Sequence, residues 1–312
     1  MTPTNLQLIE QFISHILSIK RYSPLTARNY RHDLEEFLRW GELSSGGDFE
    51  LLQVKGEDLR RWMMTLSEEG KMKSASINRT LSSLRSFYRY LRHESLVEKN
   101  PFVGVNSMRT SRRLPKYVAE EQMVYVVERV LQDAESEDYI EARNALVVLL
   151  FYASGLRLAE LVGLNVGDFA SDFSVLKVRG KGDKERVVPI VKRLREIIIR
   201  YISRFLAEKI WNSPQKPLLL AKRGERISRS DVQRTVARLL RECGVEGKSS
   251  PHVLRHTFAT HLLNEGADLR EIQELLGHSS LRATQVYTHN NIAQLRRIYS
   301  EAHPRSAEEE VE

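Results

Sequence analysis

The chain has 312 residues and a net charge of +7, so two domains are possible and a polyanionic partner is indicated, although ordinary enzymes share this charge. Cys243 is its single cysteine, which excludes an internal disulfide and a metal cluster built on cysteines. No apolar run reaches about 18 residues, and the first residues lack a basic region followed by an apolar core, so we expect a soluble, cytoplasmic protein without a membrane span.

Apolar residues at helical spacing predict four helices in the first third of the chain. We expect these helices over about 4–20, from Ser23-Pro24 to a loop that begins at Gly41, over 56–69 and over 74–93. Together they predict a compact four-helix domain over residues 1–107. Its arginines can contact DNA phosphates, although a solvated face explains them equally well; the candidates are Arg28, Arg31, Arg79 and Arg85.

The segment 108–117 is predicted to be a linker, because it combines Pro and Ser with charges of one sign. Its basic residues include Arg112 and Arg113, and no acidic residue lies among them. A basic linker beside a DNA duplex gains an attraction to the phosphates that weakens as salt rises. We therefore count Arg112 and Arg113 among the candidate DNA contacts.

Residues 118–312 are predicted to form a second, α-rich domain. Helices are expected over about 119–132, 141–154, 158–164, 192–210 and 230–243. A β-hairpin is predicted, with strands over residues 173–178 and 186–191 and Lys181 in its turn. A lysine in such a turn is ordinarily exposed to solvent and has no further role. Arg229 and Arg234, at the start of the helix near 230, are further candidate contacts with a duplex.

The stretch from Pro251 to His289 combines side chains that bind phosphate or move protons with one potential nucleophile; these are His252, Arg255, His278 and Tyr287. Pro251 suits the first position of a helix, in which His252 and Arg255 lie on nearly one face and can reach one ligand. The opposite stripe is apolar and contains Leu254, Phe258, Leu262 and Leu263. A helix over 269–276 is followed by a turn with His278 and by a third helix that carries Tyr287. This combination favours phosphoryl transfer.

A metal site is also conceivable here, because His252 and His256 are four residues apart. The residues between them are Val-Leu-Arg, so the glutamate of an HExxH motif is absent and the charge of Arg255 opposes a cation. We therefore expect no metal site.

The motifs of this stretch resemble those of the tyrosine recombinase (phage integrase) family. That family's His-x-x-Arg, Leu-Gly-His and Tyr are matched by His252-Val-Leu-Arg255, Leu276-Gly277-His278 and Tyr287. More narrowly, residues 254–289 are similar to the Xer branch, whose members resolve chromosome dimers in bacteria and archaea. One departure is Leu281-Arg282-Ala283-Thr284-Gln285, where Xer proteins commonly show Ser-Thr-Thr.

The resemblance implies a mainly α fold, with an N-terminal four-helix, SAM-like core-binding domain and an integrase-like catalytic domain with a small β-hairpin. It also implies a site-specific recombinase that cleaves and rejoins DNA through a 3′-phosphotyrosyl intermediate. The family's Gly-Leu-Arg-x-x-Glu segment supplies a catalytic arginine, here Arg157, supported by Glu160; in isolation such a pair is a surface ion pair. The six catalytic positions implied are Arg157, Lys181, His252, Arg255, His278 and the nucleophile Tyr287.

These six groups suffice for strand exchange without metal, ATP or another cofactor, because the bond energy is kept in the covalent intermediate. The family implies a homo- or hetero-tetramer with a recombinase paralogue on double-stranded DNA at a dif-like site, and an FtsK-type translocase as a possible activator. The expected role is resolution of chromosome or plasmid dimers. A mobile-element integrase is the alternative within the family. A type IB topoisomerase is disfavoured by the continuous integrase-like motifs, and a non-enzymatic DNA-binding protein by the presence of all six residues.

Overall fold

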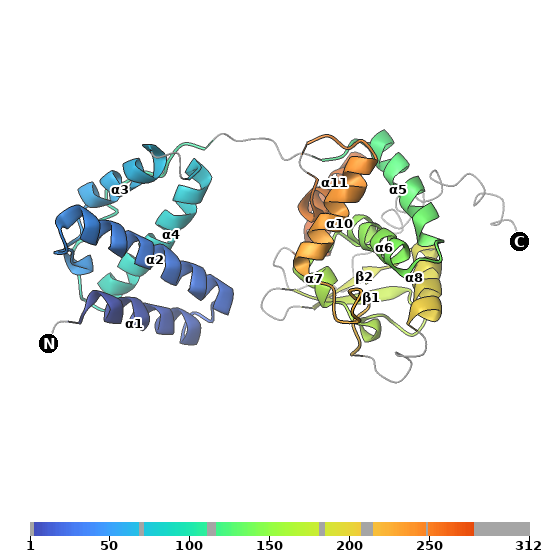
Figure 1. Cartoon of the computed structure of the whole chain (residues 1–312), viewed down its shortest axis with the longest axis horizontal. Coiled ribbons are helices and arrows are strands. Elements are labelled where there is room, and N and C mark those ends of the chain that lie inside the picture. Colours follow the sequence, from blue (N-terminus) through green and yellow to red (C-terminus); the bar gives the residue numbers. More distant parts are fainter. Residues whose placement is uncertain are drawn as a thin grey trace, which may run out of the picture. The chain divides into compact units, whose positions relative to one another are not determined.

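The computed structural model describes residues 3–68, 72–110, 117–180, 185–206, 215–247 and 249–277 (Figure 1). The chain divides into two compact units, residues 1–113 and 114–312. In the described part the fold is mainly helical with one small two-stranded antiparallel sheet, which confirms the predicted fold class. None of the helices described is long and apolar enough to cross a lipid bilayer.

The first unit is a helical bundle whose members all pack against a shared core. Its elements are α1 (Asn5–Ser18), α2 (Pro24–Ser45), the 3-10 helix η1 (Leu51–Gln53), α3 (Gly56–Glu68) and α4 (Ser74–His93). Aromatic rings fill the centre, where Phe12 lies edge-on to Phe87 and Phe37 lies edge-on to Trp62. These side chains are buried and supply much of the apolar area that holds the bundle together.

Helix α2 is longer than the sequence predicts, and the prediction that a loop begins at Gly41 was wrong. Gly41 is buried inside the helix, and a Cβ atom at this position would collide with the ring of Phe49. The glycine therefore makes room for a side chain from the next segment instead of ending the helix. The helix ends at Gly46, whose φ of 73° is the left-handed conformation of a C-cap.

The segment after α4 folds back onto that helix. Asn78 Nδ2 donates a hydrogen bond to the Met108 carbonyl at 2.9 Å, and the Met108 amide donates to Asn78 Oδ1 at 2.8 Å. Arg85 donates to the Val105 carbonyl at 3.2 Å and lies over the ring of Phe102. Met108, which the sequence assigns to the linker, is therefore held by the first unit.

The second unit is built around one helix that is buried along most of its length. Its elements are α5 (Glu120–Ala134), α6 (Tyr139–Ser154), α7 (Leu158–Gly163), the 3-10 helix η2 (Val166–Asp168), β1 (Val175–Arg179), β2 (Glu185–Pro189), α8 (Lys192–Phe205), α10 (Arg229–Glu242), α11 (Pro251–Asn264) and α12 (Leu269–Leu275). Every residue of α6 from Ala142 to Ser154 is buried. Helices α5, α7, α8, α10 and α11 all contact α6, which lies among them in Figure 1.

The two strands pair with Leu176 opposite Val188 and Val178 opposite Arg186. Leu176, Val178 and Val188 are buried, as alternation along a strand requires for the face toward the core. Arg186 occupies the same inward face and is also buried. A charged side chain at such a position needs partners, which the next subsection describes.

Candidate active site

The turn between α6 and α7 positions the first candidate arginine. Helix α6 ends at Gly155, whose φ is 56°, and a Cβ there would lie 2.6 Å from Phe258 and 2.8 Å from Leu276. Only a glycine allows α11 and the end of α12 to approach the turn this closely. Arg157 then caps α7; its amide donates to Glu160 Oε2 at 2.7 Å and its Nη1 donates to Glu160 Oε1 at 2.9 Å.

Arg255 reaches the same place from α11. Its Nη2 donates to the Leu276 carbonyl at 2.6 Å, and its Nη1 donates to the Gly155 carbonyl. Its side chain is 11% exposed, and Nη1 lies 4.0 Å from Glu160 Oε2. Burial, together with the positive charge of Arg157, lowers the pKa of Arg255 to about 10, so the guanidinium remains charged at neutral pH.

A third arginine completes the cluster, and sequence reasoning missed it. Arg186 Nη1 and Nη2 donate to Glu160 Oε1 and Oε2 at 2.9 and 2.7 Å, which is a bidentate pair. Burial alone would raise the pKa of Glu160, but the hydrogen bonds from Arg186 and Arg157 outweigh it and hold the pKa at about 2. The sequence signal was the arginine in an inward position of β2, which becomes visible only once the strand register is known.

A cavity of about 340 Å³ lies beside this cluster and is lined by Arg157, Leu158, Ala159, Arg229, His252 and Arg255. It brings together three of the residues that the resemblance implies as catalytic, from the start of α7 and the first turns of α11. Arg229, predicted only as a DNA contact, joins them from the start of α10. The cavity thus combines three guanidinium groups with one imidazole, a donor set suited to an anion such as a phosphodiester.

One detail of α11 differs from expectation. Leu254, Phe258 and Leu262 are buried as predicted, but Leu263 is 42% exposed and does not belong to the apolar stripe. Among the residues described, no group of three His, Cys, Asp or Glu side chains is arranged to hold a metal ion. His256 is half-buried, and its ring packs against that of Tyr117.

Several predicted residues lie outside the described part of the chain: Lys181, His278, Tyr287, Arg112 and Arg113. The helix predicted around Tyr287 lies outside it too. The description ends at Gly277, whose φ is 71° and whose carbonyl accepts a hydrogen bond from Arg157 Nη2 at 3.3 Å. The residue directly before His278 therefore contacts the arginine cluster.

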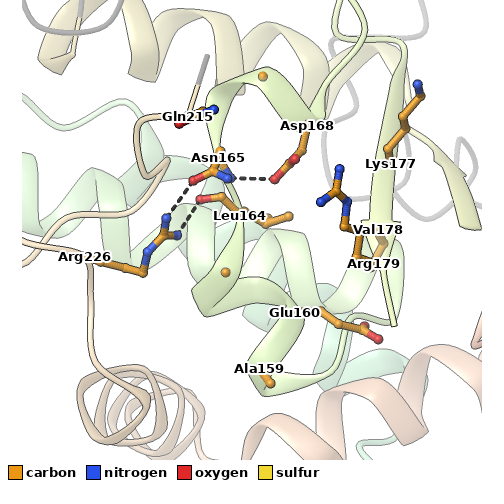
Figure 2. A pocket seen from close by; sticks show the side chains of 12 residues that line it. Ala159, Glu160, Leu164, Asn165, Asp168, Lys177, Val178, Arg179, Gln215 and Arg226 are labelled. Atoms are coloured by element: carbon orange, nitrogen blue, oxygen red, sulfur yellow. Dashed lines mark hydrogen bonds between the residues drawn. The ribbon is translucent and has the colours of Figure 1, made fainter. Parts of the chain in front are cut away.

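A second, larger cavity of about 540 Å³ shares Ala159 with the first and is also lined by Glu160 (Figure 2). Arg226 donates to the carbonyls of Val162 and Leu164 at 2.9 and 3.0 Å, so it caps the end of α7. Lys177 and Arg179 come from the exposed face of β1 and form a basic wall of this larger cavity in Figure 2.

Residues 123–294 match the phage integrase family, and residues 9–95 match the phage integrase N-terminal SAM-like domain. The chain belongs to the phage integrase family. The tyrosine recombinase XerC of Thermodesulfovibrio yellowstonii is 40% identical to it, over 98% of this chain and 100% of the relative. The tyrosine recombinase XerC of Alcanivorax borkumensis is 37% identical over 96% of this chain and 95% of the relative. The predicted resemblance is therefore confirmed, and the protein is a site-specific tyrosine recombinase.

Solved structures share the fold of this phage integrase family member. The XerH site-specific recombinase bound to palindromic difH substrate, in a post-cleavage complex, has a TM-score of 0.69 and 22% identity, over 96% of this chain and 85% of that chain. A lambda integrase tetramer bound to a Holliday junction has a TM-score of 0.66 and 19% identity, over 92% of this chain and 80% of that chain. At such identities the likeness shows the fold.

Most of the recombinase's candidate DNA-contacting arginines in described regions have partners within the protein. Arg79 makes a bidentate pair with the buried Asp33, at 2.7 and 2.8 Å, and Arg31 donates to Glu10 at 2.9 Å. Arg85 is held by the segment before the linker, and Arg234 pairs with Asp231. Arg28 is exposed on α2, and Arg229 lines the smaller cavity. The sequence pattern did not separate arginines that hold the fold from those that face solvent.

Proposed function

We propose that the recombinase cleaves and rejoins double-stranded DNA at a specific site through a 3′-phosphotyrosyl intermediate at Tyr287. The observation that carries the proposal is the convergence of Arg157, His252 and Arg255 on one small cavity. These side chains come from segments separated along the chain, yet they line the same space. We assign this cavity to the scissile phosphate.

The two partly buried arginines suit the charge that develops during cleavage. Attack on a phosphodiester concentrates negative charge on the non-bridging oxygens, and planar guanidinium groups can donate two hydrogen bonds each to such oxygens. Arg157 and Arg255 are already fixed by Glu160 and by the carbonyls of Gly155 and Leu276. Preorganised donors need little rearrangement in the transition state, which is where such groups accelerate reactions most.

The bonds and protons of the covalent step are all accounted for without an external cofactor. The Tyr287 oxygen bonds to phosphorus while the bond from phosphorus to the 5′ oxygen breaks, and a 5′ hydroxyl of the partner strand later reverses the exchange. His252 takes the phenol proton, Lys181 protonates the 5′ oxygen, and His278 adds a hydrogen bond to the phosphate. Each proton transfer contributes typically ~10²–10⁴-fold. A phenol with a pKa of ~10 leaves more readily than an alkoxide, so the second step is also feasible.

We further propose that residues 1–107 and 118–312 serve as the core-binding and catalytic domains, with Arg112 and Arg113 in the basic linker. The expected assembly is a homo- or hetero-tetramer with a paralogue on a dif-like site, with an FtsK-type translocase as a possible activator, in the cytoplasm. Relatives named XerC support a Xer-type role, and solved neighbours bound to difH substrate or, as a tetramer, to a Holliday junction support the DNA partner and the tetramer. Resolution of chromosome or plasmid dimers is the role we favour over mobile-element integration.

The test is incubation of the purified protein, with EDTA, on a nicked suicide duplex carrying the host's chromosome-dimer resolution site, followed by a denaturing gel. We expect a covalent species in the native protein and none in Tyr287→Phe, which should still bind the duplex. Tyr125→Phe, at an exposed tyrosine of α5, is the matched control and should keep the covalent species. A covalent species that persists in Tyr287→Phe would refute the nucleophile assignment.

A further inference from the structure

Arg186 lies in an unusual position for an arginine. It stands on β2 opposite Val178, on the face that packs into the core, and is 5% exposed. Burying a guanidinium is costly unless it is paired and hydrogen-bonded. An apolar residue at position 186, like Val188 two residues further along β2, would stabilise the strand more easily. The position therefore calls for an explanation beyond packing.

Both terminal nitrogens of Arg186 are used on one carboxylate. They bond the two oxygens of Glu160, while Arg157 bonds the same carboxylate through its amide and its Nη1. Glu160 thus accepts from two arginines and lies 4.0 Å from the third, Arg255. Arg186 is too deeply buried to touch DNA itself.

The charges of this cluster explain what Arg186 adds. A buried carboxylate next to an anion-binding cavity would repel a phosphodiester and draw Arg157 into a closed pair with itself. Arg186 offsets the charge of Glu160 with a bidentate pair, so the charges of Arg157 and Arg255 remain available to the cavity. The cluster of three arginines and Glu160 therefore has a net charge of about +2, where without Arg186 it would have about +1.

The guanidinium of Arg186 also lies close to Gly277, the residue directly before His278. A Cβ built at Gly277 would lie 3.3 Å from Arg186 Nη1 and 3.4 Å from Arg157 Nη1. The guanidinium of Arg186 therefore lies directly beneath the backbone at the end of α12.

We infer that Arg186 is a positioning residue of the recombinase, which neutralises and orients Glu160 so that Arg157 and Arg255 can bind the scissile phosphate. The inference rests on the proposed function, because it assigns the cavity to that phosphate. Arg186 acts through Glu160 and not by contact with the substrate.

The first test compares Arg186→Met with Arg143→Met in single-turnover cleavage of the suicide duplex, with gel-shift affinity and thermal unfolding measured on the same samples. Arg143 is the matched control, because it is also buried in the second unit but bonds the Leu220 carbonyl and Asn144. We expect Arg186→Met to cleave about 10²-fold more slowly at saturating protein, as misplaced catalytic groups do, with little loss of affinity. Arg143→Met should lose stability but keep its cleavage rate.

Arg186→Lys keeps the positive charge, and it is the variant to test if Arg186→Met does not fold. One ammonium cannot bond both carboxylate oxygens in the geometry of a guanidinium, so its cleavage rate should lie between those of the native protein and Arg186→Met. A native rate in folded Arg186→Met or Arg186→Lys would overturn the inference. An equal slowing in Arg143→Met would overturn it too, since a general loss of core packing would then explain the effect.

The second test is a double-mutant cycle with Glu160→Gln. If Arg186 acts through Glu160, Arg186→Met should slow cleavage far less in the Glu160→Gln background than in the native protein. Additive effects would show that Arg186 acts by another route. Failure of the native protein to form the Tyr287 adduct would count against the proposed function instead, so the two failures are distinguishable.

Discussion

His261 Nε2 lies 2.9 Å from the carbonyl oxygen of Val118, the residue that leads into α5, and the Val118 amide donates to Thr257 Oγ1 at 2.9 Å. Helix α11 therefore holds both polar backbone groups of Val118. The same helix carries His252 and Arg255 at its start. Helix α11 thus fixes the segment by which the chain enters the second unit, and it also positions the site residues His252 and Arg255.

The His261 contact predicts that acid destabilises the second unit. Burial lowers the pKa of His261 below its ordinary 6.5, against the opposing effect of the Val118 carbonyl, and Tyr152 contacts Nδ1 at 3.0 Å. The neutral ring is thus favoured in the fold, so its contribution is complete above pH 6.5 and is lost as pH falls below that value. We expect the melting temperature to fall more steeply between pH 7 and 5 in the native protein than in His261→Gln. Equal slopes would contradict this prediction.

Glu160→Gln should destabilise the second unit whether or not DNA is present. Its free energy of unfolding should fall by about 3–5 kcal/mol, because Arg186 is left buried without a counter-charge. Because the pKa of Glu160 is lowered to about 2 from 4.5, its contribution is complete above pH 4.5 and is lost as pH falls toward 2. Urea unfolding at several pH values measures both effects. Glu98→Gln, at an exposed site of the first unit, should change neither.

Gly155→Ala should disrupt the site by separating α7 from α11. An alanine in the left-handed conformation costs about 1–2 kcal/mol, and its Cβ would also collide with Phe258 and Leu276. We expect a lower melting temperature and slower cleavage. Gly163→Ala is the control, because a Cβ there meets nothing within 4 Å. An equal loss in both variants would show that the close approach at Gly155 is not responsible.

Substitutions at Arg28 and Arg79 should affect different properties: the first should weaken DNA binding, and the second should lower the stability of the first unit. Arg28 is exposed on α2, so Arg28→Ala should weaken DNA binding uniformly, reduce its salt dependence and leave the melting temperature unchanged. Arg79→Met removes the charged partner of Asp33, which is 3% exposed and keeps its hydrogen bond from Ser83, and should destabilise the first unit by about 1–3 kcal/mol. Gel shifts over a salt series, paired with thermal unfolding, measure both. Loss of stability in Arg28→Ala would contradict the distinction.

Local patterns predicted the helices well. Helix α4 runs from Ser74 to His93 as its apolar periodicity predicts. The Arg157–Glu160 pair, which was expected from the resemblance to the family's Gly-Leu-Arg-x-x-Glu segment, is formed. What could not be read locally depends on contacts between distant residues. Gly41 looks like a helix end until Phe49 is seen to pack on it, and Arg186 looks like an ordinary strand residue until its pair with Glu160 is known. The roles of Lys181, His278 and Tyr287 stay predictions.

The burial of α6 has a consequence for how the recombinase unfolds. Backbone amides in a helix enclosed on all faces exchange with solvent only when the whole unit opens, so those of Leu146 to Phe151 should be among its slowest. The same helix ends at Gly155, whose carbonyl accepts from Arg255, and leads within two residues to Arg157. The arginine cluster is thus tethered to the part of the unit that we expect to be most protected, so Arg157 should keep its place when less protected segments fray.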